Sequence, residues 1–313
     1  MNEVQMSDLN CLFAEEDQVK EGVILIDLSQ IAMATILHTY KEGDKLTTPM
    51  VRHLILSTLK FNAFKWKKDG YTKIVICVDN AINGYWRRDV AYYYKKNRAK
   101  AREESNWDWE GYFEGLRTVI DEFKQYMPYY VIDIDKAEAD DSIAVLTKKF
   151  SLEGHPVMIV SSDGDFTQLH KYPNVKQWSP MQKKLVKSKT GSPALDCMVK
   201  IIKGDKKDNV ASIKVRSDFW YTHVDGERTP STKMTFVEEC LDAGENIKDL
   251  LTEEQYKRFL ENRVLIDFDY IREDIVANIL DCYNNYQLPG RGKIYSYFVK
   301  SGLSKLMKEI NNF

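Results

Sequence analysis

Four short apolar segments in this chain each end in aspartate, and a chain with that pattern has few ways to fold. The segments are VILID at 23–27, KIVICVD at 73–79, YYVIDID at 129–135 and VMIVSSD at 157–163. Such apolar runs, rich in β-branched residues, are typical of strands that are buried on both faces. Helical segments are expected at 29–40, 49–69, 106–127 and 138–153. The alternation predicts an α/β fold in which a mostly parallel central sheet is flanked by helices.

Capping residues mark the ends of two expected helices. Thr48 is a candidate N-cap, and Pro49 follows it in the first helical turn, where the missing N–H of proline is tolerated. Gly154 follows the segment 138–153, as glycine commonly does at the C-terminal end of a helix.

The pattern changes beyond Ser192, where polar stretches separate helical segments expected at 234–243, 252–264 and 271–286. The sequence therefore predicts three parts. They are an acidic, flexible N-terminal segment at 1–21, an α/β domain at 22–192 and a smaller, mainly helical C-terminal domain at 193–313.

The composition is that of an ordinary soluble protein, with 43% hydrophobic and 29% charged residues among 313. No apolar run approaches the roughly 18 residues that a membrane-spanning helix needs, so a cytoplasmic protein without a membrane partner is expected. The five cysteines are odd in number and far apart, which argues against a disulfide framework or a thiolate zinc site. The five histidines are also scattered, so any metal ion should be held by oxygen atoms.

Carboxylates are expected to gather where the strands end. The carboxyl ends of parallel strands lie at one edge of an open sheet. This rule brings together Asp27, Asp79, Asp163 and one of the pair Asp133 and Asp135.

Further acids follow closely along the chain. Three lie in the first turn of the helix expected at 138–153, one completes a D-G-D motif, and two belong to a G-D-K-K-D-N motif. These six are Glu138, Asp140, Asp141, Asp165, Asp205 and Asp208. Taken singly, most of the acids are explained by a turn, an N-cap or the helix dipole.

Together, eight or nine carboxylates at one edge, without a matching set of buried arginines, would repel one another or become protonated. Divalent cations remove this difficulty, and Mg²⁺, for which Mn²⁺ can substitute, is the ion that carboxylates and water suit. Two ions about 4 Å apart would stabilise the attacking and leaving oxygens of a phosphoryl displacement. The acids therefore predict a two-metal phosphodiesterase site.

A basic and aromatic stretch follows the second expected strand. From 85 to 102 the sequence YWRRDVAYYYKKNRAKAR has seven basic residues and one acid, although the net charge of the whole chain is only −2. Cations that neutralise phosphates, beside rings on which bases stack, are typical of single-strand binding. The alternative is a solvated helix whose tyrosines cover the core. The position just after Asp79 favours a nucleic-acid passage above the metal site.

Six motifs together resemble the 5′-nuclease superfamily of flap endonucleases and 5′→3′ exonucleases, and within it the ribonuclease H group of T-even bacteriophages. They are LIDLSQIA, CVDN…GYWRRD, YYYKKNRAKAREES, EADDSIA, SSDGDFTQL and GDKKDNV. The similarity runs from about Gly22 to Phe313. It implies an enzyme that needs Mg²⁺ or Mn²⁺ and cleaves RNA primers in RNA–DNA hybrids, duplex DNA from the 5′ end, and flap junctions.

The resemblance also implies roles for single residues. Those serving the metal near the scissile phosphate would be Asp27, Asp79, Glu138, Asp140 and Asp163. Those serving the second metal, directly or through water, would be Asp165, Asp205 and Asp208, and Asp141 belongs to either set. A basic arch at about 84–105 carries the family's Tyr-Lys-x-x-Arg motif. The arch residues that would contact nucleic acid are Arg87, Tyr94, Lys95, Lys96 and Arg98. Of these, Lys95 and Arg98 would stabilise charge in the transition state.

One motif departs from the family. Many members follow the second acidic pair with a glycine-containing helix-hairpin-helix that binds duplex backbone with a monovalent ion, whereas VASIKVRSDFW here has no glycine. Backbone contacts are instead expected from Lys203, Lys206, Lys207, Lys214 and Arg216.

Two protein partners are also expected. Leu9, Leu12 and Phe13 in the acidic N-terminal segment are arranged like a short sliding-clamp-binding peptide, although a plain tail explains them as well. The basic C-terminal segment could meet a single-stranded DNA-binding protein, as the resemblance implies, or could simply pack the last helices.

The sequence thus predicts a monomeric phage replication nuclease that removes RNA primers and adjacent DNA from lagging-strand fragments. Its substrates would be RNA–DNA hybrids and duplex, forked and flapped DNA. Two alternatives stay open. One is a PIN-type nuclease that acts on single-stranded RNA, and the other is a catalytically inactive DNA-binding module that recruits other proteins.

Overall fold

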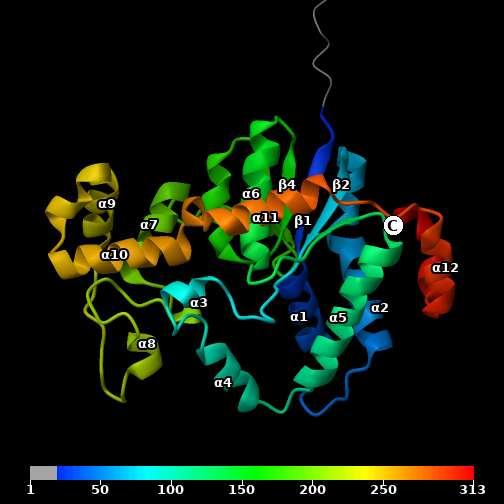
Figure 1. Cartoon of the computed structure of the whole chain (residues 1–313), viewed down its shortest axis with the longest axis horizontal. Helices are drawn as coiled ribbons and strands as arrows, with labels where there is room; N and C mark the ends of the chain where they lie inside the picture. Colours follow the sequence, from blue (N-terminus) through cyan, green and yellow to red (C-terminus); the bar gives the residue numbers. More distant parts are fainter. Residues whose placement is uncertain (1–19) are drawn as a thin grey trace, which may run out of the picture.

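A six-stranded sheet forms the centre of the computed structural model, which describes residues 20–313 (Figure 1). The strand order is β3-β2-β1-β4-β5-β6. The strands are β1 (Gly22–Asp27), β2 (Tyr71–Cys77), β3 (Tyr130–Ile132), β4 (Val157–Val160), β5 (Val175–Ser179) and β6 (Lys184–Leu185). Every neighbouring pair is parallel except β5 and β6. The predicted α/β fold with a mostly parallel sheet is confirmed.

The four strands expected from the apolar pattern are all present. Every residue of β1 and β4 is buried, as expected of strands covered on both faces. β3 and β4 end earlier than expected, so Asp133, Asp135 and Asp163 lie in the segments that follow the strands. The strands β5 and β6 are not expected from the sequence, because lysines and polar residues interrupt their apolar character.

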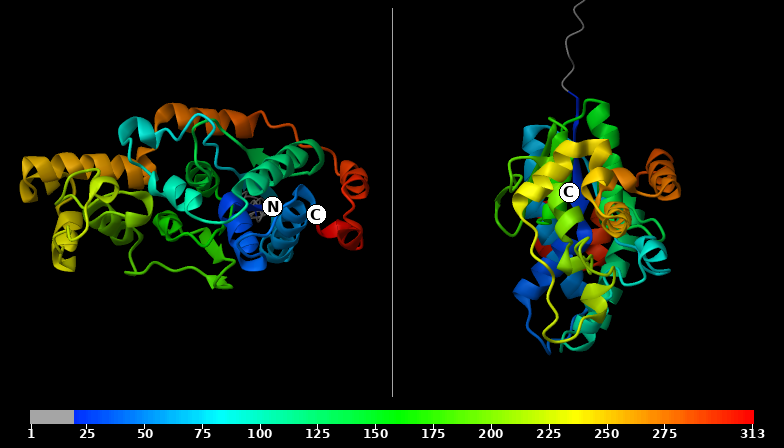
Figure 2. Two further views of the ribbon diagram at one scale, coloured as in Figure 1. Left: turned by 90° about the horizontal axis from the view of Figure 1, so that it is seen from below. Right: turned by 90° about the vertical axis from the view of Figure 1, so that its left-hand side faces the viewer.

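One face of the sheet is covered by α1 (Leu28–Thr39), α2 (Thr48–Asn62) and α5 (Trp109–Tyr126). Their apolar side chains share a core with Ile24 and Ile26 of β1. The last helices, α12 (Lys293–Lys300) and α13 (Ser304–Met307), join the same core. The end of the chain therefore packs beside the helices that begin it (Figure 2).

The other face is covered by α6 (Ala139–Leu152) and α11 (Glu273–Asn284). Val23 and Leu25, which alternate with the β1 residues of the first core, share this second core with Ile143 and Ile279. The sheet is thus enclosed between two helical layers.

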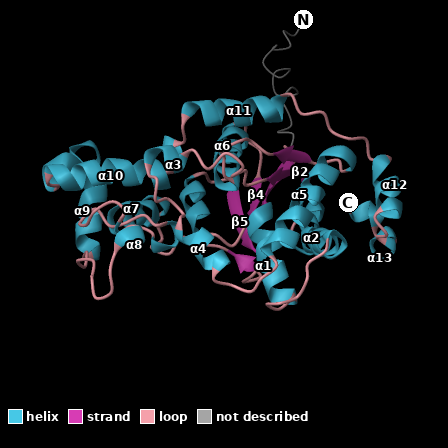
Figure 3. Cartoon of the chain, turned by 60° about the horizontal axis from the view of Figure 1, so that its bottom comes forward, coloured by secondary structure: helices cyan, strands magenta, loops and turns pink. Residues whose placement is uncertain are grey.

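A third core lies beside the sheet, where α7 (Pro193–Lys203), α9 (Met234–Ala243) and α10 (Glu253–Ile266) gather at one end of the molecule (Figure 3). Tyr93 and Tyr94 pack into it from the arch, which contains α3 (Arg87–Val90) and α4 (Asn97–Glu103). The arch is therefore anchored on the helical part of the chain. The division of the chain at residue 192 stays a prediction.

The remaining elements are short. They are α8 (Phe219–Thr222) and the 3-10 helices η1 (Phe64–Asp69), η2 (Gly164–Lys171), η3 (Lys206–Asp208), η4 (Gly244–Leu250), η5 (Phe268–Tyr270) and η6 (Ile310–Asn312). The helix expected at 49–69 is in fact two elements, α2 and η1. In the described part of the chain, no helix combines the length and the apolar character needed to cross a bilayer.

The predicted C-terminal end of α6 is found in the structure, whereas the predicted N-cap of α2 is not. Gly154, with a φ of 80°, follows the end of α6 in the left-handed conformation that glycine favours. The N-cap of α2 is Thr47, so the expectation of Thr48 is wrong by one residue. Thr48 and Pro49 instead begin the helix.

Candidate active site

The strand-end carboxylates Asp27 and Asp79 lie at one edge of the sheet. Asp27 ends β1 and caps α1, because its Oδ1 accepts a hydrogen bond from the Gln30 N–H at 3.1 Å. Its Oδ2 accepts from the Ser161 hydroxyl at 2.8 Å. Asp79 follows β2 and accepts from the Ala139 N–H at 2.8 Å. That bond ties it to the start of α6.

The first turn of α6 brings three acids to the same edge. Asp141 accepts from the Glu138 N–H at 2.9 Å and from the Trp86 indole N–H at 3.0 Å. These bonds turn Glu138 and Asp141 inward, where both are buried, whereas the side chain of Asp140 keeps 21% of its surface exposed. Asp140 is therefore the most accessible acid of the three.

Three of these carboxylates are poorly compensated. Burial and the nearby negative charge of Asp79 raise the pKa of Asp27 to about 7. Burial and the charge of Glu138 raise the pKa of Asp79. Burial raises the pKa of Asp140 well above its ordinary value, although Lys95 opposes the rise. Within residues 20–313, no lysine or arginine nitrogen lies within 4.0 Å of Asp27 or Asp79. A cation would relieve this repulsion.

Glu138 and Asp141 are compensated by a buried arginine. Arg87 lies 2.8 Å from Glu138 Oε2 and 2.8 Å from Asp141 Oδ1, and it donates to the Leu265 carbonyl at 3.1 Å. Only 2% of Arg87 is exposed. It therefore orders the carboxylates and cannot contact nucleic acid directly, which corrects the expectation from the sequence.

Lys95 lies at the centre of the site. Its Nζ contacts Glu138 and lies 4.0 Å from Asp140 and 3.8 Å from Asp208. Lys95 has a φ of 54°, and its backbone N–H donates a hydrogen bond to the Asp208 carbonyl at 3.0 Å. Burial would raise the pKa of Glu138, but Lys95 and Arg87 outweigh it and lower that pKa. The sequence predicts no matching set of buried arginines. The structure has one buried arginine, Arg87, and one buried lysine, Lys95, beside these acids.

The second acidic group lies where α7 meets η2 and η3. Gly204, with a φ of 81°, ends α7, and a Cβ there would lie 2.4 Å from the Val210 carbonyl oxygen. This close approach fixes the turn that carries Asp205 and Asp208. Asp208 pairs with Arg98 at 2.5 Å. Burial would raise the pKa of Asp208, but Lys95, Arg98 and Lys207 lower it to about 2.

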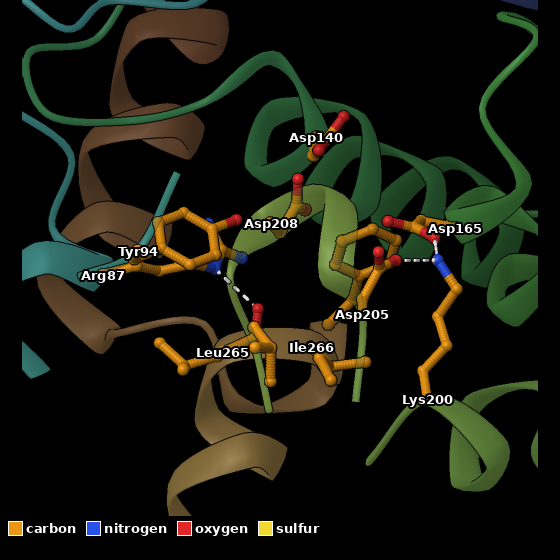
Figure 4. Close-up of a pocket in the computed structure, with 11 residues that line it drawn as sticks. Arg87, Tyr94, Asp140, Asp165, Lys200, Asp205, Asp208, Leu265 and Ile266 are labelled. Carbon is orange, nitrogen blue, oxygen red and sulfur yellow. Dashed lines mark hydrogen bonds and ion pairs between the residues drawn. The ribbon is translucent and has the colours of Figure 1, made fainter. Parts of the chain in front are cut away.

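Lysines pair with the other acids of this group. Lys207 Nζ lies 2.7 Å from Asp163 Oδ2. Lys200 contacts both Asp165 and Asp205, and its Nζ lies 2.8 Å from Asp205 Oδ2 (Figure 4). In the described residues, no three acids, histidines or cysteines are already arranged to hold one metal ion. Lysine and arginine side chains lie between the carboxylates instead.

Two expected residues do not join this site. Asp133 pairs with Arg117 at 2.8 Å and Lys124 at 2.6 Å, while Asp135 accepts from Asn83 at 3.0 Å. The expectation that one of them meets Asp27 is therefore wrong. The reason is that β3 stops at Ile132, so the chain turns before either aspartate reaches the shared edge.

The arch presents few of its expected contacts to solvent. Tyr94 is buried, and its hydroxyl donates to Glu138 Oε2 at 3.1 Å, so it supports the site from inside. Lys96 is exposed, and 42% of the Arg98 side chain is exposed. Of the arch cations expected to contact nucleic acid, these two remain accessible to a phosphate.

The expected backbone contacts of the C-terminal part differ in availability. Arg216 is paired with Glu227 through two nitrogens, one of them 2.8 Å from Glu227 Oε2. Lys214 donates to the Ser231 carbonyl at 3.2 Å, and Lys206 stacks over Trp220 at 4.9 Å from the ring centroid. Lys203 lies 3.8 Å from the sulfur of Met234. Among residues 20–313, Lys203, Lys206 and Lys214 therefore have no carboxylate within 4.0 Å, whereas Arg216 has one.

Two residues that contact the predicted metal ligands are not found by sequence reasoning. Ser161 orients Asp27, and Lys200 bridges two predicted metal ligands. A lysine in the last turn of a helix is normally explained by the helix dipole, so nothing in the local sequence singles out Lys200. Leu9, Leu12 and Phe13 lie outside the described residues.

Two family models match the chain. One is described as the 5′-3′ exonuclease N-terminal resolvase-like domain and matches residues 23–193. The other is described as the C-terminal part of T4 RNase H and matches residues 191–313. Ribonuclease H of Enterobacteria phage T4 is 67% identical over 298 residues, which cover 95% of this chain and 98% of that protein.

Solved structures show the same fold at low sequence identity. The zinc-bound 5′-exonuclease of phage T5 has a TM-score of 0.59 and 15% identity over 85% of this chain and all of that one. The T5 flap endonuclease in complex with DNA and metal ions has a TM-score of 0.56, 15% identity and the same coverage.

Proposed function

Because the chain belongs to the 5′-3′ exonuclease family and is a nuclease, we propose that it removes RNA primers and adjacent DNA from lagging-strand fragments in phage replication. It would act 5′→3′ on RNA–DNA hybrids and on duplex, forked and flapped DNA. The observation that carries this proposal is the meeting of Asp27, Asp79 and Asp140 beside Lys95. Such a site suits phosphodiester hydrolysis and has more carboxylates than a recruitment module needs.

The donor set fits divalent metal ions. Asp27, Asp79 and Asp140 offer oxygen ligands, and the upward shift of their pKa values supports a cation at this place. We propose that they hold a first Mg²⁺, with Glu138 and Asp163 close by, and that Asp165, Asp205 and Asp208 hold a second. Mn²⁺ should substitute. Bound there, the ions would stabilise negative charge on the phosphate and lower the pKa of water.

The chain's own residues would position the substrate. Arg98 and Lys96 at the accessible side of the arch would bind the phosphates of the incoming 5′ strand. Lys95 would stabilise charge that develops on the scissile phosphate, because its ammonium group is already fixed among acids and needs little reorganisation. Arg87 and Tyr94 would hold Glu138 in place.

A 5′-flapped RNA–DNA hybrid, incubated with and without Mg²⁺, tests the proposal. Products that shorten from the 5′ end only in the presence of Mg²⁺ are expected. Cleavage of single-stranded RNA alone would instead favour the PIN-type alternative. Binding without any cleavage would favour the recruitment module.

Removal of divalent metal should change how stability depends on pH. The pKa of Asp27 is about 7 in the folded protein, against an ordinary 3.8, so the folded state binds more protons between these values. In EDTA, thermal stability should therefore fall as the pH rises from about 4 through 7. With saturating Mg²⁺ the fall should disappear, because the ion binds the ionised carboxylates. Identical profiles in differential scanning fluorimetry with and without Mg²⁺ would contradict the metal assignment.

The N-terminal segment is proposed to bind a sliding clamp through Leu9, Leu12 and Phe13. Deletion of residues 1–19 should abolish stimulation of cleavage by the phage clamp, while cleavage without the clamp should stay unchanged. Every proposed ligand lies in residues 20–313, so the basal reaction needs none of the deleted residues. A truncated protein that is still stimulated would end the proposal.

The remaining proposals concern the cellular setting. We propose that the protein acts as a monomer at the replication fork in the host cytoplasm. A single-stranded DNA-binding protein is the proposed partner of the C-terminal part of the chain.

A further inference from the structure

One lysine occupies a place that two predicted metal ligands share. Lys200, in the last turn of α7, lies between the carboxylates of Asp165 and Asp205. Figure 4 shows its ammonium group directed at both carboxylates. A quarter of the Lys200 side chain is exposed, against 16% for each aspartate.

We propose that Lys200 is an internal counter-ion that competes with the second divalent ion and so sets the affinity of the second metal site. This inference rests on the proposed metal-dependent function. It assigns to Lys200 a positioning role and no contact with the reacting atoms. Metal binding at the second site would require the ammonium group to leave the carboxylates.

The competition follows from charge and distance. An ammonium group and a divalent ion that contact the same carboxylate oxygens repel each other, so each weakens the binding of the other. Lys200 contacts both acids, so its removal would take away the competing charge from the whole pair. Its long, flexible stem and partial exposure allow the ammonium group to move aside when an ion enters.

The two metal sites should differ in affinity for the same reason. Asp27 and Asp79 have no lysine or arginine nitrogen within 4.0 Å among residues 20–313, so a first ion displaces no partner from these two acids. Lys95 and Lys207 lie beside the other first-site acids, Asp140 and Asp163, at 4.0 and 2.7 Å. The pair Asp165 and Asp205 is already partly compensated by the single positive charge of Lys200. A tight first ion and a weaker second ion are therefore expected.

The test compares Mn²⁺ binding to the full-length wild type and to the Lys200→Met variant by titration calorimetry and electron paramagnetic resonance. The variant should bind the weaker Mn²⁺ about ten-fold or more tightly, with little change at the tighter ion. Lys203→Met is the matched control. Lys203 lies one turn away on α7 and contacts the sulfur of Met234 instead of a carboxylate, so a less than about two-fold change is expected.

A second measurement separates competition from a loss of folding. Without metal, Lys200→Met should melt at a lower temperature than wild type, because Asp165 and Asp205 lose their partner. The double variant Lys200→Met with Asp205→Asn should recover part of that loss and lose the tightened Mn²⁺ binding. Its failure to recover stability would count against the counter-ion role.

Unchanged or weaker binding of the second ion in Lys200→Met would overturn this inference while leaving the metal-dependent function intact. Absence of Mn²⁺ binding to the wild type would instead overturn the proposed function, and the inference with it. The two failures are therefore distinguishable in one set of titrations.

Discussion

Asparagine in place of Asp27 should lower the rate of 5′-flap cleavage by about a thousand-fold or more, while the fold stays intact. Asparagine is as good an N-cap as aspartate and can still accept the hydrogen bond from the Gln30 N–H, so the change removes mainly the negative charge. A catalytic metal contributes several kcal/mol of transition-state stabilisation, and each 1.36 kcal/mol corresponds to a factor of ten in rate. Single-turnover cleavage at saturating Mg²⁺ measures the effect.

The same variant should be more stable than wild type when metal is absent. Burial and Asp79 raise the pKa of Asp27 to about 7, so at higher pH its charge destabilises the folded state, and Asp27→Asn removes that charge. A matched control is Asp108→Asn at the N-cap of α5. Hydrogen bonds from the Leu46 and Gly111 N–H groups lower the pKa of Asp108, so its neutralisation should lower stability.

Opposite signs of the two stability changes, with lost cleavage only at Asp27, would separate a metal ligand from a structural cap. Near-normal cleavage by Asp27→Asn would contradict the assignment. A variant that is less stable than wild type in EDTA would do so as well.

The acidic edge of the sheet is predictable because each strand and the aspartate that follows it are adjacent in the sequence. An apolar run followed by aspartate gives both the strand and the position of the carboxylate, and parallel pairing then brings the strand ends together. Asp27 and Asp79 follow this rule. Asp133 does not, because β3 is only three residues long and its chain turns toward Arg117 and Lys124.

The basic partners of the acids are not predictable in the same way. The sequence from 85 to 102 shows many cations but not which of them face inward. Arg87 reaches the acids of α6, 51 residues away from Glu138, and Arg98 reaches Asp208, 110 residues away. Such pairs depend on how the arch packs against α7 and α10, so they cannot be predicted from a local sequence pattern. The pairing of Lys200 with Asp165 is likewise a contact between residues far apart in the sequence, so it is not predicted either.

Alanine in place of Lys95 should lower the single-turnover rate by about a hundred- to a thousand-fold, the range seen when one preorganised donor to a transition state is removed. Lys95 is 4% exposed and lies 4.0 Å from Asp140, so its charge acts where the metal ligands and the phosphate would meet. Binding of duplex DNA should change little, because a buried ammonium group adds little to the attraction of distant phosphates.

Lys96→Ala is the matched control for Lys95→Ala. Lys96 is adjacent and exposed, so its loss should weaken DNA binding in a salt-dependent way and leave the saturated rate nearly unchanged. Fluorescence anisotropy in EDTA gives the affinities, and quenched-flow cleavage with Mg²⁺ gives the rates. If Lys95→Ala lowered only the affinity, as Lys96→Ala should, Lys95 would be a phosphate contact like its neighbour, and the buried ammonium group would have no part in the chemical step.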